Sequence, residues 1–198
     1  MKASLEAGKV VSLPSAVTIA DGTAVKTPGD QVFPYIQKNL DSIITIEDEE
    51  LIVNFLDIVE NHKMVVENSG LLTVAALKHL KCQGKRVVSI LSGGNMDIIT
   101  MSSVVQHGLI ERGRVFTLSV QLPDRPGELV RVAQVIAEAK GNVIRLDHNQ
   151  FVSINRNAAV ELKITMEAFG FEHRDEILMA LRNAGYEPKV ENPTSIYS

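Results

Sequence analysis

The chain has 198 residues, of which 45% are hydrophobic, and a formal net charge of −4; this composition predicts one packed domain or two small ones and argues against general disorder. Lys and Arg are scattered among Asp and Glu, which excludes the basic patch of a nucleic-acid partner, and no apolar stretch approaches the roughly 20 residues of a membrane span. The single cysteine, Cys82, excludes a disulfide framework and favours a cytoplasmic protein, and the five separated histidines predict no metal site.

Turn-forming residues dominate the first 42 residues. Pro14, Gly22, Pro28 and Pro34 interrupt short apolar pieces, and residues 32–39 predict a helix. Such a stretch is unlike the start of an independent fold, so we expect it to be the middle of a larger one.

Strands and helices are expected to alternate from residue 41 to about residue 105. Residues 43–46 and 86–91 are short β-branched runs that predict strands, the second of them buried. Four carboxylates at residues 47–50 precede apolar residues at helical spacing, so they favour the first turn of a helix. Further helices are predicted over residues 71–80 and from Met96 to about Val105. This alternation is the α/β pattern.

A change of pattern at residues 112–114 is the predicted boundary, which gives domains 1–112 and 113–198. Alternating apolar residues at 116–122 predict a half-buried strand. A helical stripe follows, made of Leu129, Val132, Ala133 and Ile136. Strands over residues 143–151 and 158–166, a helix around Ile177 and a strand over residues 187–190 complete a βαββαβ order, typical of the ferredoxin-like split motif. The tail, residues 192–198, is expected to fray.

The loop before that helical stripe is a candidate ligand site. Gly127 allows a tight backbone turn, helix N-terminal amides can hold a carboxylate, and Asp124 can accept from an ammonium group. A turn made by Pro126 and Gly127, with Asp124 as a helix cap, is the alternative. Residues 115–190 resemble an ACT domain, a small amino-acid-sensing module. The resemblance implies that Asp124, Pro126 and Gly127 bind an effector such as isoleucine or valine, and that paired modules form a homo-oligomer.

Four short motifs occur in the first part of the chain: residues 18–22, residues 27–29, the segment beginning at Glu67, and residues 91–97. In this order they resemble the C-terminal part of the catalytic domain of pyridoxal-phosphate (PLP) dependent threonine ammonia-lyases, also called threonine dehydratases. That family has the tryptophan-synthase β-like fold (fold type II). The resemblance implies an α/β segment of such a lyase over residues 1–112, with PLP as the cofactor of the complete enzyme.

The resemblance also implies roles for individual residues. Ser92 matches the serine whose hydroxyl faces the pyridine nitrogen of PLP, and a neutral hydroxyl tunes the ring to a moderate electron sink. Gly93 and Gly94 allow close backbone approach to the ring. Asp21 and Gly22 match a loop on the substrate side. Glu67 matches an acidic residue near the ring, in a segment that departs from the family's Glu-Gly-Ala-Gly pattern, and Asn95 matches a nucleotide-effector contact of some relatives. The alternative for Ser92 is a helix N-cap.

Two parts of the family's machinery have no counterpart in the sequence. No lysine lies in a Schiff-base motif, and no glycine run could cradle the cofactor phosphate, so no catalytic residue is assigned here. We therefore expect a partner, the N-terminal lyase half, and no activity from the chain alone. The first hypothesis is the C-terminal half of an L-threonine (L-serine) ammonia-lyase that makes 2-oxobutanoate and ammonia. The others are a stand-alone amino-acid-binding regulatory module and a plain fragment.

Overall fold

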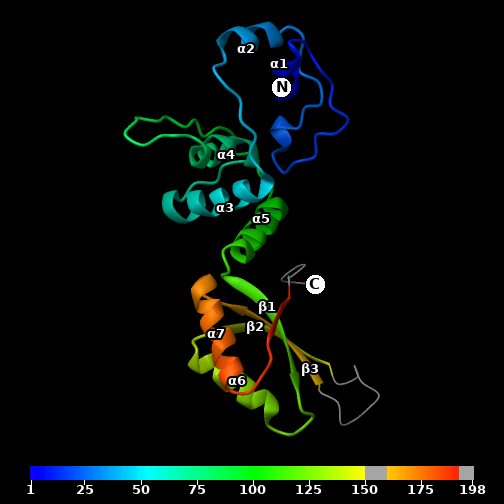
Figure 1. The fold of residues 1–198 in the computed structure, drawn as a ribbon, viewed down its shortest axis with the longest axis vertical. Coiled ribbons are helices and arrows are strands. Elements are labelled where there is room, and N and C mark those ends of the chain that lie inside the picture. The colour runs from blue at the N-terminus through cyan, green and yellow to red at the C-terminus, as the bar shows by residue number, and fades with distance from the viewer. Residues whose placement is uncertain (150–159, 192–198) are drawn as a thin grey trace. The chain divides into compact units, whose positions relative to one another are not determined.

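The computed structural model describes residues 1–149 and 160–191. The chain divides into two compact units, Met1–Val105 and Gln106–Ser198, which we call unit 1 and unit 2 (Figure 1). Within the described residues, no helix has the length and apolarity needed to cross a membrane. The two units are described separately below.

Unit 1 is built from helices and loops. Its α-helices are α1 (Lys2–Ala7), α2 (Phe33–Asn39), α3 (Asp48–Asp57), α4 (Asn68–Ala75) and the beginning of α5 (Ile98–Glu111). A π-helical turn, Ile58–His62, extends α3, and the 3-10 turn Ala76–His79 extends α4. The helices predicted from periodicity are therefore confirmed, and α5 runs beyond the predicted end near Val105. The core gathers around Leu51 and Phe55 of α3 and Leu71 of α4, all fully buried.

The first turn of α3 explains the four carboxylates of residues 47–50. The Glu47 backbone N–H donates to Glu50 Oε2 at 3.4 Å, and His79 Nε2 lies 2.8 Å from Glu50 Oε1. The hydrogen bond with His79 is the main cause that lowers the pKa of Glu50 below its usual value. Glu50 thus links the start of α3 to the end of the turn that extends α4.

We expect the Glu50→Gln variant to lose about 1 kcal/mol or less of unfolding free energy at neutral pH, because a capping contact and a partly exposed ion pair are weakened. The pKa of Glu50 is lowered by folding, so its contribution is present above the unfolded pKa and is lost as pH falls through the folded one. Urea denaturation of both proteins at neutral and strongly acidic pH measures this. A difference that persists in acid would contradict it, and Glu49→Gln, which removes a neighbouring first-turn charge, is the control.

The two strands predicted in unit 1 are wrong. Residues 43–46 and 86–91 form no strand, and the second run is not buried, since Val88 is 89% and Ile90 71% exposed. Residues 86–91 lie in a long loop, residues 81–97, that we call the arm (Figure 1). Side chains tie the arm to α4: Thr73 Oγ1 donates to the Ile90 carbonyl at 2.9 Å, and Ser89 Oγ donates to the Thr73 carbonyl at 3.2 Å. β-branched composition alone does not make a strand, because a ladder needs a second strand.

Unit 2 has the element order predicted for it. It contains β1 (Val115–Leu122), α6 (Glu128–Glu138), β2 (Asn142–Asn149), β3 (Val160–Glu167), α7 (Phe171–Asn183) and β4 (Lys189–Glu191). The strands form one antiparallel sheet in the order β2-β3-β1-β4. The parts of the predictions that fall on residues 150–159 and on the tail, residues 192–198, lie outside the described residues.

The core of unit 2 lies between the sheet and its two helices. Apolar residues alternate along β1, where Leu118 faces Ile164 of β3 and Val120 faces Leu162, all almost fully buried. The two helices pack together against the sheet (Figure 1). Val132 and Ile136 of α6 are buried as the stripe predicts, whereas Ala133 is exposed at its edge. The period-2 pattern of β1 and the helical pattern of α6 therefore meet in one core.

The sheet ends in two strands with an unpaired edge among the described residues, β2 and β4. Val143 and Leu146 of β2 occupy core-facing positions opposite Met166 and Ile164, yet 38% and 37% of their surfaces are exposed. The helices therefore cover the middle of the sheet more completely than the β2 edge.

Candidate functional site

Glu67 connects three of the sequence motifs in unit 1. It is the N-cap residue of α4, its backbone N–H donates to the Gly93 carbonyl at 3.3 Å, and its Oε2 accepts from the Asn95 N–H at 3.4 Å. Its Oε1 also lies near Gly22, since a Cβ added at Gly22 would be 3.6 Å from it. The segments around residues 22, 67 and 93 are far apart in the sequence, and the fold brings them together.

Two glycines at this site are required by close approach. A Cβ at Gly93 would collide with the Glu67 carboxylate, and the φ of Gly93 is +78°, a value that other residues rarely adopt. A Cβ at Gly22 would lie 2.8 Å from Ser69 Oγ. Gly93 is expected to allow close approach of the backbone to a cofactor ring. In this structure the group that lies close to its backbone is the Glu67 carboxylate.

The turn that carries Asp21 and Gly22 is held from two helices. Asp48, the first residue of α3, accepts from the Thr18 hydroxyl at 2.5 Å and from the Ile19 N–H at 3.0 Å. Asn68, the first residue of α4, donates from Nδ2 to the Ile19 carbonyl at 3.0 Å. Sequence reasoning missed Asp48 and Asn68, since their role depends on contacts between distant segments. A polar residue at the start of each helix was the available signal.

Two buried polar atoms of the site have no hydrogen-bond partner among the residues that the structure describes. These atoms are Asn68 Oδ1 and Ser69 Oγ, both on the first turn of α4 beside Gly22 and Glu67. Buried polar groups are nearly always satisfied, so an orphaned pair indicates a place where another polar group binds. Ser92, Gly93, Gly94 and Asp21 are exposed and form the open side of the site.

Ser92 is not a helix cap. Helix α5 begins six residues later, at Ile98, and Asp97 caps it by accepting from the Ile99 and Thr100 N–H groups at 2.9 Å. The Thr100 hydroxyl is the main cause that holds the pKa of Asp97 below its usual value. The N-cap alternative for Ser92 is therefore wrong, and its hydroxyl stands at the surface next to Gly93.

The orphaned oxygens, the two glycines and the exposed hydroxyl fit PLP. Ser92 supplies a neutral hydroxyl of the kind that can face a ring nitrogen, a Cβ at Gly94 would meet only the Val65 carbonyl at 3.9 Å, and Asp21 and Gly22 border the same open side. Among the described residues, no three His, Cys, Asp or Glu side chains are gathered as metal ligands would be.

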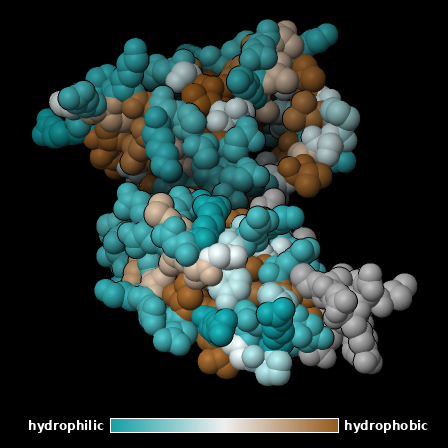
Figure 2. Space-filling model, turned by 60° about the horizontal axis from the view of Figure 1, so that its bottom comes forward, coloured by the Kyte–Doolittle hydropathy of each residue, from teal (hydrophilic) through white to brown (hydrophobic). Residues whose placement is uncertain are grey.

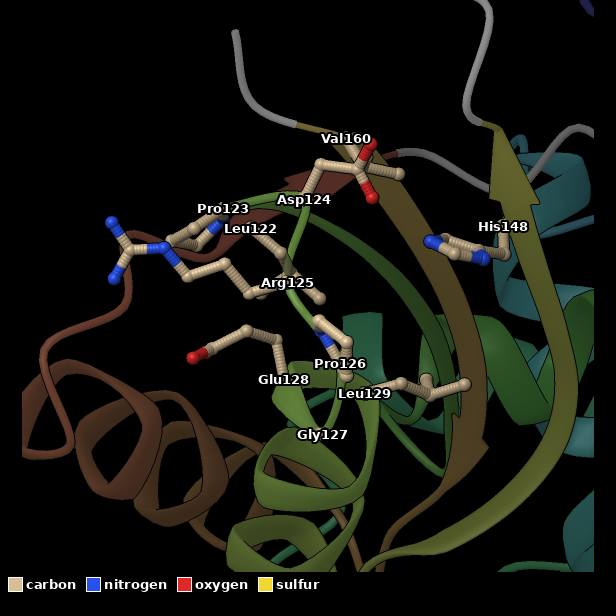
Figure 3. Close-up of a pocket in the computed structure, with 10 residues that line it drawn as sticks. All are labelled: Leu122, Pro123, Asp124, Arg125, Pro126, Gly127, Glu128, Leu129, His148 and Val160. Atoms are coloured by element: carbon tan, nitrogen blue, oxygen red, sulfur yellow. The ribbon is translucent and has the colours of Figure 1, made fainter. Parts of the chain in front are cut away.

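Unit 2 has a cavity of about 310 Å³ at the loop between β1 and α6. Its lining includes Asp124, Pro126 and Gly127, the residues that the ACT resemblance assigns to an effector, and Gly127, with a φ of +92°, is the N-cap residue of α6. Figure 3 shows Asp124 and His148 on two sides of the opening, with Pro126 and Leu129 beneath and Arg125 directed away. Asn95, the fourth residue predicted to hold an effector, lies in unit 1 beside Glu67.

Sequence reasoning missed His148 in this cavity. It lies on β2 opposite Leu162, two residues after Leu146, which faces Ile164. Because strand side chains alternate, His148 shares the core-facing side with Leu146. A polar residue at an apolar position of a predicted strand was therefore the signal that could have found it.

Comparison with known proteins finds relatives of unit 1 and of the chain as a whole. The family model "Pyridoxal-phosphate dependent enzyme" matches residues 1–93. An L-threonine ammonia-lyase of Geobacter sulfurreducens is 40% identical over 185 residues, which are 92% of this chain and 46% of that protein. An L-threonine ammonia-lyase of Thermotoga maritima is 32% identical over 96% of this chain and 48% of that protein.

A solved structure of threonine deaminase isoform 2 from Solanum lycopersicum is 26% identical, with a TM-score of 0.48, over 54% of this chain and 32% of that chain. The chain spans a little under half the length of the Geobacter and Thermotoga relatives. Residues 1–93 therefore form a segment related to the pyridoxal-phosphate dependent enzymes, within a chain that is similar over most of its length to the L-threonine ammonia-lyases.

Proposed function

We propose that unit 1 is the cofactor-contacting part of a PLP-dependent L-threonine (L-serine) ammonia-lyase, which releases 2-oxobutanoate and ammonia. The observation that carries this proposal is the meeting of the segments at Gly22, Glu67 and Gly93 around one carboxylate and two orphaned oxygens. The relatives that bear this activity in their names support the substrate class. Serine is included because its side chain also carries a β-hydroxyl.

Each residue has a part in this proposal. PLP, when bound, supplies an electron sink for charge that develops at the substrate α-carbon. The Ser92 hydroxyl would hold the ring nitrogen without a formal charge, and the lack of side chains at Gly93 and Gly94 would let the backbone approach the cofactor. Glu67 accepts a hydrogen bond from the Asn95 N–H and would keep a carboxylate near the cofactor. The turn at Asp21 and Gly22, held by contacts from α3 and α4, borders the substrate side.

The proposal includes a protein partner. A PLP lyase also needs an amine placed against the ring and a separate grip on the phosphate, and we assign both to an N-terminal lyase half. Two observations support this assignment: Ser92, Gly93 and Gly94 of the arm are exposed, and the same arm exposes Val88 and Ile90. Figure 2 shows apolar side chains, in brown, at the surface of unit 1.

The Ser92→Ala variant tests the lyase proposal. In the complete enzyme we expect a drop in kcat of roughly 100-fold, with folding unchanged, because a polar contact to the ring is lost and no core volume is removed. Steady-state kinetics with L-threonine, together with the cofactor's absorbance, measures this. The Ser89→Ala variant, on the same arm, is the control. Normal turnover in Ser92→Ala with PLP still bound would refute the assigned role.

We further propose that unit 2 is an ACT domain with the ferredoxin-like arrangement, which senses an amino acid. The βαββαβ order and the cavity at Asp124 and Gly127 support this proposal. A branched-chain end product, isoleucine or valine, would place its ammonium at Asp124 and its carboxylate at the start of α6. Binding would bias the lyase by a coupling of roughly 1–3 kcal/mol. A stand-alone sensing module is the alternative, and it rests on the same cavity.

Effector binding and self-association are measured together. We expect calorimetric titration of the full chain with L-isoleucine and L-valine to show a binding site that Asp124→Ala removes and that Glu176→Ala, on helix α7, leaves unchanged. We also expect sedimentation to show a homo-oligomer, because the β2 edge is open and carries partly exposed apolar residues. A monomer at high concentration that binds no amino acid would remove the sensing proposal while leaving the lyase proposal intact.

A further inference from the structure

A second cavity in unit 2 lies at the other end of β1. Its volume is about 230 Å³, and its lining includes Leu109, Arg114, Lys140, Asn142, Glu167 and Phe169. The Asp124 cavity adjoins the end of β1 at Leu122, whereas this one adjoins its beginning at Val115. Val115 and Leu122 are seven positions apart on an extended strand, so the two cavities lie roughly 20 Å from each other. The two cavities are therefore distinct sites.

The lining of this cavity combines both signs of charge with apolar surface. Arg114 and Lys140 contribute cations, Glu167 contributes a carboxylate, and Leu109 and Phe169 contribute apolar groups. Asn142 Nδ2 donates to Glu167 Oε2 at 2.8 Å, which orients the carboxylate. The cavity is smaller than the roughly 300–1,000 Å³ of most ligand sites, so its ligand is small. This set of groups complements a small zwitterion with an apolar part.

The Phe169 side chain, which lines the cavity, is held in position although it is exposed. Phe169 is 82% exposed, yet its ring stacks on His173 with the ring centroids 4.7 Å apart. The Phe169 N–H donates to His173 Nδ1 at 3.0 Å, and since Nδ1 accepts, the ring proton lies on Nε2, which donates to the Ala139 carbonyl at 2.7 Å. His173 thus fixes an exposed aromatic ring relative to the residue before Lys140. A preorganised apolar wall of this kind lowers the cost of binding.

Lys140 occupies a backbone conformation that favours glycine. Its φ is +62°, it follows the end of α6, and its N–H donates to the Ala137 carbonyl at 2.9 Å. Helices usually place glycine at such a position, because the backbone of any other residue is strained there. Gly141 comes one position later, so the lysine stands where glycine would be cheaper. Backbone strain of this kind is concentrated at functional sites.

We propose that this cavity binds an α-amino acid with an apolar side chain, separately from the Asp124 cavity. The carboxylate of the ligand faces Arg114 and Lys140, its ammonium faces Glu167, and its side chain packs on Leu109 and Phe169. The ordinary explanation of Lys140 is that a cation complements the C-terminus of α6, and that explanation predicts no ligand. The proposal does not depend on the lyase reaction.

The test uses the full chain carrying Asp124→Ala, which removes the first cavity from the measurement. L-isoleucine is titrated by calorimetry and by NMR, next to L-isoleucinamide, which lacks the carboxylate, and 3-methyl-2-oxopentanoate, which lacks the ammonium. We expect L-isoleucine to bind at one site and to shift the amide signals of residues 140–142 and 167–169. Each analogue should bind about tenfold more weakly or worse, because one charge-assisted contact is lost.

Two glycine variants separate binding from stability. Lys140→Gly relieves the positive φ and removes the ammonium, so it should be at least as stable as the parent and bind L-isoleucine about tenfold more weakly. Lys63→Gly is the matched control, since Lys63 has a φ of +57° in unit 1, and it should gain stability without affecting binding. Glu167→Gln should weaken the binding of L-isoleucine and leave the binding of 3-methyl-2-oxopentanoate, which has no ammonium group, unchanged.

The outcomes distinguish this site from the proposed effector site. Absence of L-isoleucine binding in the Asp124→Ala chain, or binding that neither Lys140→Gly nor Glu167→Gln weakens, overturns the second site and leaves the Asp124 proposal standing. Binding in Asp124→Ala that Lys140→Gly abolishes supports the second site. If the unsubstituted chain also binds L-isoleucine at this second site alone, the proposed effector site at Asp124 is rejected and the second site is retained.

Discussion

The purified chain, mixed with PLP and L-threonine, is expected to release no ammonia above background. Covalent catalysis by this cofactor needs an amine against the ring and an independent hold on the phosphate, and neither motif occurs in the sequence. The structure also leaves Ser92 and Gly94 at the surface, where water competes for every contact that the site could make. The expected loss is complete, which makes this the largest effect among our predictions.

A coupled assay for ammonia measures the rate, with the whole Geobacter sulfurreducens L-threonine ammonia-lyase as the positive control under the same conditions. Threonine-dependent ammonia release that scales with the concentration of the chain and survives repurification would contradict the prediction. The part of that Geobacter protein which this chain does not match, added in equal amount, is the natural complement to try for recovery of activity.

The Gly70→Ala variant is expected to destabilise unit 1 by about 2 kcal/mol. Gly70 lies in α4, where alanine by itself would favour the helix by about 1 kcal/mol. A Cβ at Gly70, however, would collide with the Ser92 carbonyl and lie 2.8 Å from Val66 Cγ1. Overpacking of this kind costs about 1–3 kcal/mol or more, and a clash with a backbone atom belongs at the upper end. The contact therefore outweighs the helix propensity.

Urea denaturation followed by circular dichroism measures this loss, and hydrogen exchange at residues 91–95 locates it. Gly29→Ala is the control, because its Cβ would meet only Val32 Cγ2 at 3.9 Å and should change stability by less than about 0.5 kcal/mol. An increase in stability for Gly70→Ala would show that Ser92 and the arm do not lie against α4.

The helices of unit 1 could be predicted because their signals are local. The carboxylates of residues 47–50 lie within one turn of the apolar residues that they precede, and Glu50 makes its capping contact inside that turn. The strands predicted at residues 43–46 and 86–91 do not form, because a strand exists only if a second segment supplies its hydrogen bonds, and a local pattern does not show whether one does. In unit 2 those second segments are present, so the same kind of pattern gave correct strands.

The candidate site divides in the same way. The motifs that carry the family resemblance contain Gly22, Glu67 and Gly93, and the structure brings these three together. The positions of the other site residues depend on contacts between segments that are distant in the sequence. The hold of Asp48 on the turn at Ile19 joins residues 29 positions apart, and the position of Lys140 in a cavity with Glu167 follows from how α6 and β3 pack. No local pattern marks such residues.

The exposed arm has a consequence for how this protein behaves in a cell. Residues 87–91 combine β-branched and apolar side chains without proline or charge, and such windows template intermolecular β-pairing when they are accessible. Lys85 and Arg86 stand immediately before the window, where gatekeeper charges oppose stacking of identical segments. Solubility of the isolated chain therefore depends on two cations at one end of a five-residue stretch, and any polypeptide that covers this stretch also acts as its protection against aggregation.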